Sequence, residues 1–439
     1  MFNFDETDRL MANVSPANAA PVQEQSSNQS YTTALSMVTV LFFFWGFVTS
    51  LNDILIPHLK SIFDLNYTKI MLIQFAFFTG YFLFSLPAAK IVDTLGYKKT
   101  MVIGLVTMAV GAFGFLPAAM IPSYPFFLGA LMIVAGGMTA LQVSANAYVV
   151  VLGNPETASS RLNLSQAFNS FGTFIGPALG GFLILSAAPK SAEAIRAMSD
   201  QALHAYRVQE ASSVKMPYIV IGLSLLLFAV LIGLFKLPAM AQAERHRASG
   251  SIWKYRHLVL GAIGIFVYVG AEVSIGSFLI NYFAEPTIGN LTQQAAARYV
   301  SLYWGCAMVG RFVGSAILQK VKAGTLLGIF AMGAMALVAT SMLATGHVAM
   351  WSIIFVGLFN SIMFPTIFSL GLAKLGPLTG DGSGLLIAAI VGGAIIPVAQ
   401  GWIADHIGIH HAFILPVICY AYIVYYGLRG SRPVVPAGA

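Results

Sequence analysis

Residues 217–235 read PYIVIGLSLLLFAVLIGLF and contain no charged side chain. About 20 consecutive apolar residues are enough for an α-helix to cross the hydrocarbon core of a bilayer. Similar stretches recur along the chain, which is 58% hydrophobic and only 9% charged. Soluble domains carry about 25% charged residues. This chain has too few charged side chains to cover the surface of a water-soluble fold. The sequence therefore predicts an all-α membrane protein.

Twelve apolar runs of this kind are present, six on each side of a polar connector. We predict membrane spans at 34–59, 68–89, 100–121, 124–152, 161–187, 216–237, 257–284, 297–319, 323–344, 348–374, 382–404 and 410–428. The chain then divides into a disordered tail (1–31), a six-helix half (32–238), a linker (239–255), a second six-helix half (256–430) and a short tail (431–439).

The basic residues predict the orientation of these spans. They concentrate in alternate connectors, at positions such as Lys98, Lys99, Arg247, Lys320 and Lys322. Connectors rich in lysine and arginine stay in the cytoplasm. We therefore expect both termini to be cytoplasmic, in a multi-pass protein of a bacterial inner membrane.

A short internal repeat relates the two halves. The segment 172–181 aligns with 392–401, so that Pro177 matches Pro397 and Gly181 matches Gly401 at one common offset. Two six-span halves related by an axis along the membrane normal are typical of major facilitator transporters. The repeat therefore predicts that fold.

Two acidic residues within the spans are candidates for cation coupling. Asp53 lies in the first span and Glu272 in the seventh, which is the repeat mate of the first. Ionisable side chains inside a membrane are costly and usually face a cavity or a partner. Both acids are thus expected to bind the coupling cation. The alternative for Glu272 is a structural role as the partner of Arg311.

Amide side chains in spans four and five are candidates for substrate binding. Gln142 and Asn146 are four residues apart, and Gln166 and Asn169 are three apart, so each pair shares a helix face. Amides donate and accept hydrogen bonds, which suits sugar hydroxyl groups. The alternative is hydrogen bonding between helices. Further candidates for the same site are Trp45, Asn52, Asn281, Asn360 and Phe364.

The connector between spans two and three carries a charged motif. Asp93, Gly96, Lys98 and Lys99 follow one another closely, and they resemble the loop signature of the major facilitators. The family glycine is replaced here by Ala89. We expect a conformational role, in which this loop clamps helix ends and releases them as the halves move.

Three blocks resemble the fucose–galactose–glucose:proton symporter family of the major facilitator superfamily. They are Leu51–Leu55, Arg161–Gly172 and Phe364–Gly371. The resemblance covers the membrane core from the first span to the tenth. It implies proton-linked sugar transport through Asp53, with Gln166 and Asn169 lining the sugar cavity.

One departure separates the chain from the fucose symporter. The span-four glutamate of the fucose symporter corresponds to Gln142 in this chain. Conversely, Glu272 lies in span seven, where the fucose symporter carries a glutamine. The glucose- and galactose-type members are therefore the better match. We predict symport of a hexose with a proton. Sodium coupling is the rival, because carboxylate and amide oxygens also suit hard cations. N-acetylglucosamine or fucose are alternative substrates.

Two other functional classes compete with sugar symport. The glycines and proline of 172–181 resemble a motif of drug:proton antiporters, although such glycines also allow close helix packing. A membrane enzyme or receptor is the second class, but we find no metal-ligand spacing, nucleophile motif or phosphate loop. We thus predict a transporter with no cofactor, no metal and no nucleic-acid partner, acting as a monomer.

Overall fold

The computed structural model describes residues 31–48, 67–120, 124–184, 198–199, 201–203, 205–206, 215–238 and 251–433. Several predictions fall outside these ranges: the first tail, the larger part of the linker and the last residues of the second tail. Asn52 and Asp53 lie outside them as well.

Long helices make up the part of the chain that the structure describes. The first half contains a helix at Tyr31–Val48, then α2 (Tyr67–Leu95), α3 (Tyr97–Met120), α4 (Tyr124–Val151), η1 (Pro155–Thr157), α5 (Ala158–Ile184) and α8 (Lys215–Leu234). The second half contains η2 (Ile252–Lys254), α9 (Arg256–Ala284), α10 (Gln293–Ile317), α11 (Ala323–Leu343), α12 (Gly346–Asn360), α13 (Met363–Gly371), η3 (Gly376–Leu378), α14 (Thr379–Ala388), η4 (Ala389–Val391), α15 (Gly392–Ile407), α16 (Ile409–Ala412), α17 (Ile414–Tyr425) and η5 (Tyr426–Gly430).

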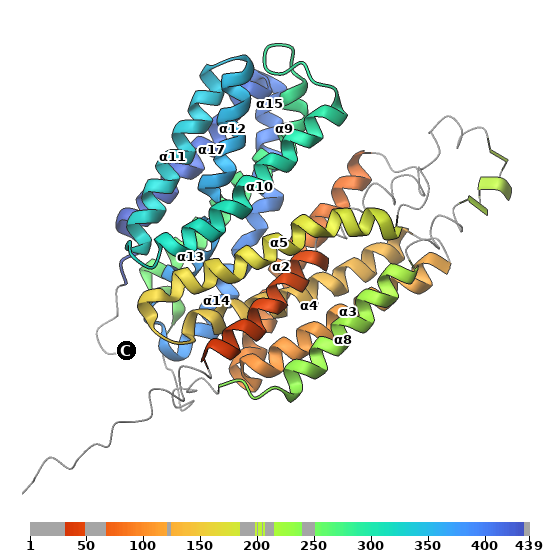
Figure 1. Cartoon of the computed structure of the whole chain (residues 1–439), viewed down its shortest axis with the longest axis vertical. Helices are drawn as coiled ribbons and strands as arrows, with labels where there is room; N and C mark the ends of the chain where they lie inside the picture. The colour runs from red at the N-terminus through yellow and green to blue at the C-terminus, as the bar shows by residue number, and fades with distance from the viewer. Residues whose placement is uncertain are drawn as a thin grey trace, which may run out of the picture.

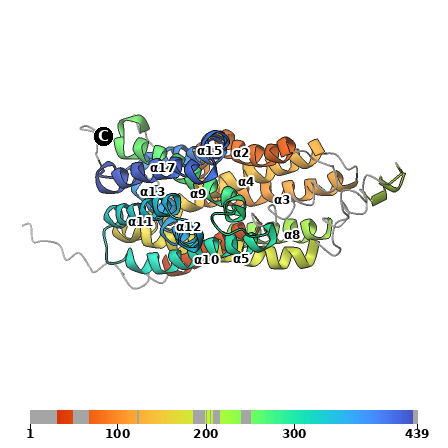
Figure 2. The same ribbon diagram turned by 90° about the horizontal axis from the view of Figure 1, so that it is seen from above.

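The all-α prediction is confirmed. Within the described ranges, 11 helical segments are long and apolar enough to cross a membrane. The polar-rich α5, which is 27 residues long, supplies the twelfth long helix. Figure 1 shows the helices in two bundles, with the elements up to α8 in one and those from α9 onward in the other. Figure 2 shows the same two groups from above.

The connector between α2 and α3 is shorter than predicted. We expected span two to end at residue 89, but α2 continues to Leu95 and places Asp93 in its last turns. Gly96 alone separates the two helices, with a φ of 84° that favours glycine. Its N–H donates to the Val92 carbonyl at 2.8 Å, which caps α2. Hydropathy places the end of this helix too early because polar residues extend it beyond the lipid.

Span ten is interrupted in its middle. We expected one run over 348–374, but α12 ends at Asn360 and α13 starts at Met363. Pro365 has no N–H to donate to the Ser361 carbonyl, four residues earlier. Broken backbone within a membrane persists where other groups satisfy the freed carbonyls. Here the Tyr268 hydroxyl donates to the Asn360 carbonyl at 3.0 Å, and Arg311 Nε donates to the Ser361 carbonyl at 3.2 Å.

Helices α3 and α4 cross at very short range. A Cβ placed on Gly137 would lie 2.5 Å from the Met108 backbone nitrogen and 2.6 Å from the Gly104 carbonyl oxygen. Small residues at such crossings let two backbones approach closely in a membrane protein. This contact gives the first bundle a tightly packed core beside the amides of α4.

Candidate functional site

Contacts join the two bundles at the end where α3 begins and where α10 and α13 finish. We call it the basic end, because Lys98, Lys320 and Lys374 lie next to these helix ends. Pairs of serines join α5 of the first bundle to α10 and α13 of the second. Ser160 Oγ donates to the Ser315 carbonyl at 2.7 Å, and Ser315 Oγ donates to the Ser160 carbonyl at 2.9 Å. The hydroxyls of Ser159 and Ser369 lie 2.6 Å apart. We call these four serines the serine latch.

Two further contacts cross between the bundles nearby. Ser383 Oγ on α14 donates to the Val143 carbonyl on α4 at 2.7 Å. Asn163 Nδ2 on α5 donates to the Arg311 carbonyl on α10 at 2.6 Å. All these side chains except Arg311 are buried. The basic end of the interface is therefore closed by polar contacts in this structure.

The predicted charged motif lies at the same end. A Cβ built on Gly380, the second residue of α14, would overlap the Asp93 carboxylate. The carboxylate thus rests on the N-terminal turn of a helix in the other bundle, where the helix dipole favours a negative charge. Lys98 Nζ donates to the Gly233 carbonyl at the end of α8, at 2.8 Å, and Lys99 is exposed.

The amides of α4 and α5 come together in the first bundle. Gln166 Nε2 donates to Asn146 Oδ1 at 3.2 Å, and Gln142 Nε2 donates to the Tyr81 hydroxyl at 2.7 Å. Tyr81 in turn donates to the sulfur of Met138 at 3.0 Å. Asn146 is fully buried, yet its Nδ2 has no partner. We call Gln142, Asn146 and Gln166 the amide row; its free hydrogen-bond donor is Asn146 Nδ2. Tyr81 is a partner of this row that the sequence did not predict.

Asn169 and Trp45 lie at the contact between α5 and the helix Tyr31–Val48. Asn169 Nδ2 donates to the Phe42 carbonyl at 3.0 Å, so part of this amide binds the neighbouring helix. Trp45 is buried, and its ring lies 5.4 Å from that of Phe42. A Cβ on Gly172 would overlap the Phe43 carbonyl. The glycine that resembled an antiporter motif thus serves close packing.

In the second bundle, Asn360 is the centre of a hydrogen-bonded cluster with three tyrosines, which we call the tyrosine cluster. Asn360 Nδ2 donates to the Tyr303 hydroxyl at 2.9 Å, and the Tyr420 hydroxyl donates to Asn360 Oδ1 at 2.7 Å. Tyr268 donates to the backbone carbonyl of the same residue. Every member is buried. Asn360 therefore orders three helices around the break in span ten.

Glu272 lies beside this cluster on α9, one turn after Tyr268. Its Oε1 is buried without a hydrogen-bond partner. The carboxyl group interacts with the Tyr268 hydroxyl and electrostatically with Arg311. Arg311 itself donates to Gln166, Ser170 and Ser361. The structure thus brings Glu272 and Arg311 into one polar region, with the arginine bonded to other groups.

The remaining candidates are less central. Asn281 is exposed near the C-terminal end of α9. Phe364 is half-buried on α13 and stacks on Phe368, with ring centroids 5.9 Å apart. Within the described ranges, no group of three or more His, Cys, Asp or Glu is placed to hold a metal ion.

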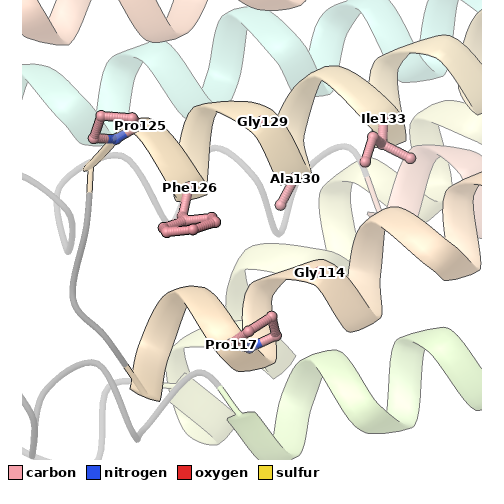
Figure 3. Close-up of a pocket in the computed structure, with 7 residues that line it drawn as sticks. All are labelled: Gly114, Pro117, Pro125, Phe126, Gly129, Ala130 and Ile133. Carbon is pink, nitrogen blue, oxygen red and sulfur yellow. The ribbon is translucent and has the colours of Figure 1, made fainter.

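A cavity of about 450 Å³ lies between α3 and α4, and none of the predicted amides lines it (Figure 3). Its lining is Gly114, Pro117, Pro125, Phe126, Gly129, Ala130 and Ile133. Sites for polar ligands need a few well-placed polar groups. This lining offers no polar side chain, so the cavity does not suit a sugar.

Comparison with known proteins places the chain among sugar transporters. The family model described as Major Facilitator Superfamily matches residues 38–390. A glucose/galactose transporter of Brucella abortus is 52% identical over 425 residues, covering 96% of this chain and all of the relative. A variant of the fucose:proton symporter FucP of Escherichia coli has a TM-score of 0.85 at 37% identity, over 91% of this chain and 98% of that one. A second FucP structure, in the outward conformation, has the same TM-score at 36% identity and the same coverage. The predicted closer likeness to glucose- and galactose-type members is confirmed.

Proposed function

The chain belongs to the major facilitator superfamily, and from this premise we propose that it takes up a hexose, glucose or galactose, together with a proton by alternating access. The observation that carries the proposal is the match to the Brucella glucose/galactose transporter, which extends over the whole of that relative. The name of the fucose:proton symporter supports a proton as the coupling ion. The protein is a transporter and not an enzyme.

The amide row of the first bundle is the proposed sugar site. Gln142, Asn146 and Gln166 offer donors and acceptors side by side, and Asn146 Nδ2 is unpartnered. Buried polar groups without partners are costly, so a ligand that supplies an acceptor gains affinity there. A hexose hydroxyl supplies both an acceptor and a donor, which fits amides better than an apolar drug.

Coupling is proposed to rest on Glu272 together with Asp53. Glu272 has an unpartnered buried oxygen, and a carboxyl group in that setting is far less costly when it carries a proton. Neutralising the carboxyl group lowers the cost of closing the site around it. Sodium is the rival ion and is separated from the proton by the experiment below.

The basic end is proposed to face the cytoplasm of a bacterial inner membrane. Its lysines fit the positive-inside rule. With this orientation, the polar contacts at the basic end close the cytoplasmic side. The structure then corresponds to an outward-facing state of a monomeric carrier.

Purified protein in proteoliposomes tests the proposal. Labelled glucose and galactose are offered under an inward proton gradient with sodium absent, and then under a sodium gradient without a proton gradient. We expect accumulation above equilibrium only with the proton gradient. Accumulation that needs sodium would reassign the ion. No accumulation of either sugar under either gradient would refute hexose symport.

A further inference from the structure

Tyr81 on α2 connects one end of the amide row to a sulfur atom. Gln142 Nε2 donates to the Tyr81 hydroxyl at 2.7 Å, and that hydroxyl donates to the sulfur of Met138 at 3.0 Å. Tyr81 and Gln142 are each 4% exposed, and Met138 is fully buried. Bulk water therefore does not compete for these two hydrogen bonds.

The Met138 sulfur sets the direction of both bonds. A thioether sulfur accepts a hydrogen bond but has no proton to donate. The single proton of the Tyr81 hydroxyl goes to this sulfur, so only lone pairs of the oxygen remain for Gln142. An amide N–H satisfies these lone pairs, whereas an amide oxygen would be repelled by them. The Gln142 amide therefore turns Nε2 toward Tyr81 and Oε1 away from it.

Packing between α2 and α4 keeps the Tyr81 hydroxyl in place. A Cβ built on Gly80, the preceding residue, would lie 2.8 Å from the Cβ of Ala135 on α4, so the two helices are in close contact here. The Tyr81 ring also meets the Phe77 ring edge to face, with centroids 5.3 Å apart. The position of the hydroxyl is thus fixed before any ligand binds.

The amide row consequently presents oxygen atoms to a ligand. Gln142 Oε1 receives no hydrogen bond from the described residues, yet it is not fully buried. The same is true of Gln166 Oε1, because the Nε2 of that residue is used by Asn146. Amide oxygens only accept hydrogen bonds. A ligand must therefore bring hydrogen-bond donors to both glutamines.

We propose that Tyr81 is a positioning residue for substrate specificity, because it makes Gln142 present Oε1 to the sugar. The site then selects a hexose with a hydroxyl group that donates at one ring carbon. A sugar with hydrogen at that carbon leaves Oε1 unpaired, and a sugar with fluorine there places two electron-rich atoms against each other. This inference rests on the proposed hexose transport and on the amide row as its sugar site.

Analogues of galactose measure the orientation of the Gln142 amide. Purified protein in detergent binds labelled galactose, and unlabelled deoxygalactoses and deoxyfluorogalactoses, changed at carbon 2, 3, 4 or 6, compete for it. Fluorine accepts a hydrogen bond weakly and donates none, so it distinguishes an amide oxygen that faces the sugar from an amide N–H. At the carbon opposite Gln142, both analogues should bind about 10- to 100-fold more weakly than galactose.

Two variants release the amide without removing it. Tyr81→Phe removes the acceptor of Gln142 Nε2. Met138→Leu removes the acceptor of the tyrosine proton, which can then go to Gln142 Oε1. Leucine and methionine have similar volumes, so the second variant is expected to fold. In both variants Nε2 can turn to the sugar, and the penalty for fluorine at that one carbon should fall to within about threefold of galactose.

Tyr282→Phe is the matched control in the second bundle. It loses the hydrogen bond from a buried tyrosine hydroxyl to the Ser341 carbonyl, at 2.8 Å, and has no contact with the amide row. Its preference among the analogues should equal that of the wild type.

The inference is wrong if the wild type binds every deoxyfluorogalactose as tightly as galactose, since no acceptor then faces the sugar. It is also wrong if Tyr81→Phe weakens galactose and all analogues by the same factor, or changes nothing, because the tyrosine is then only a packing residue. Should Tyr81→Phe not fold, the same comparison with Met138→Leu decides. Wild-type protein that binds neither galactose nor glucose would instead refute the proposed function.

Discussion

Removing the central pair of the serine latch should shift the carrier toward opening at its basic end. The Ser160→Ala/Ser315→Ala variant loses the two reciprocal hydrogen bonds of 2.7 and 2.9 Å. Each is worth about 0.5–1.5 kcal/mol net, so the closed state loses about 1–3 kcal/mol. Since each 1.4 kcal/mol is tenfold, the open-to-closed ratio should rise about 5- to 150-fold.

Distances between spin labels measure this shift directly. Glu156 and Lys320 are exposed at the basic end, one on each bundle, and accept labels as Glu156→Cys and Lys320→Cys. The background carries Cys306→Ser and Cys419→Ala, because these are the two native cysteines. Double electron–electron resonance in nanodiscs should show that a longer distance between the two labels becomes more populated in the Ser160→Ala/Ser315→Ala variant than in the otherwise wild-type background.

A matched control isolates the contact between the bundles. Ser144 is equally buried, but its hydroxyl bonds only to carbonyls of its own helix, at 2.7 and 3.2 Å. Ser144→Ala should leave the distance distribution unchanged. If the Ser160→Ala/Ser315→Ala distribution also matches wild type, the latch does not stabilise the closed basic end and the reasoning is wrong.

Three further predictions concern stability and substrate binding. Gly137→Ala should lower the free energy of unfolding by about 1–3 kcal/mol, because the new Cβ meets the backbone of α3, and a lower melting temperature in detergent would show this. The control is Gly129→Ala, whose Cβ meets nothing within 4 Å and which should melt like wild type. Asn360→Leu should be severely destabilised, because the hydroxyls of Tyr303 and Tyr420 lose their hydrogen-bond partner at a cost of about 1–3 kcal/mol each. A melting temperature within about 2 °C of wild type would show that the tyrosine cluster does not stabilise the fold. Gln166→Leu should weaken galactose binding about 10- to 100-fold by calorimetry, with folding retained, and unchanged affinity would remove this amide from the proposed site.

The fold could be predicted from the sequence, because hydropathy marks the membrane spans and the lysines and arginines mark the connectors between them. Every predicted span that the structure describes contains a helix, and the apolar content of segments such as α8 leaves no alternative environment. Helix ends were less predictable. The end of α2 was placed six residues early, because Lys90 and Asp93 lower hydropathy without breaking the helix.

The site was predictable in its residue types but not in its connections. Gln142, Asn146 and Gln166 were found by helical spacing, and the structure brings them into one row. Their tyrosine partner could not be found, since a tyrosine in an apolar span is more often core. Likewise, the interruption before Pro365 and its use by Arg311 depend on contacts far apart in the chain. Spacing alone carries no signal for such pairs.

The serine latch also shapes how fast the two bundles can part. Four small hydroxyls share the load, and none of the four carries a charge. The serine hydrogen bonds can therefore break one after another as the bundles separate, and water can take the place of each lost partner. We therefore expect the carrier to open through intermediates in which some of these four serine contacts are already broken.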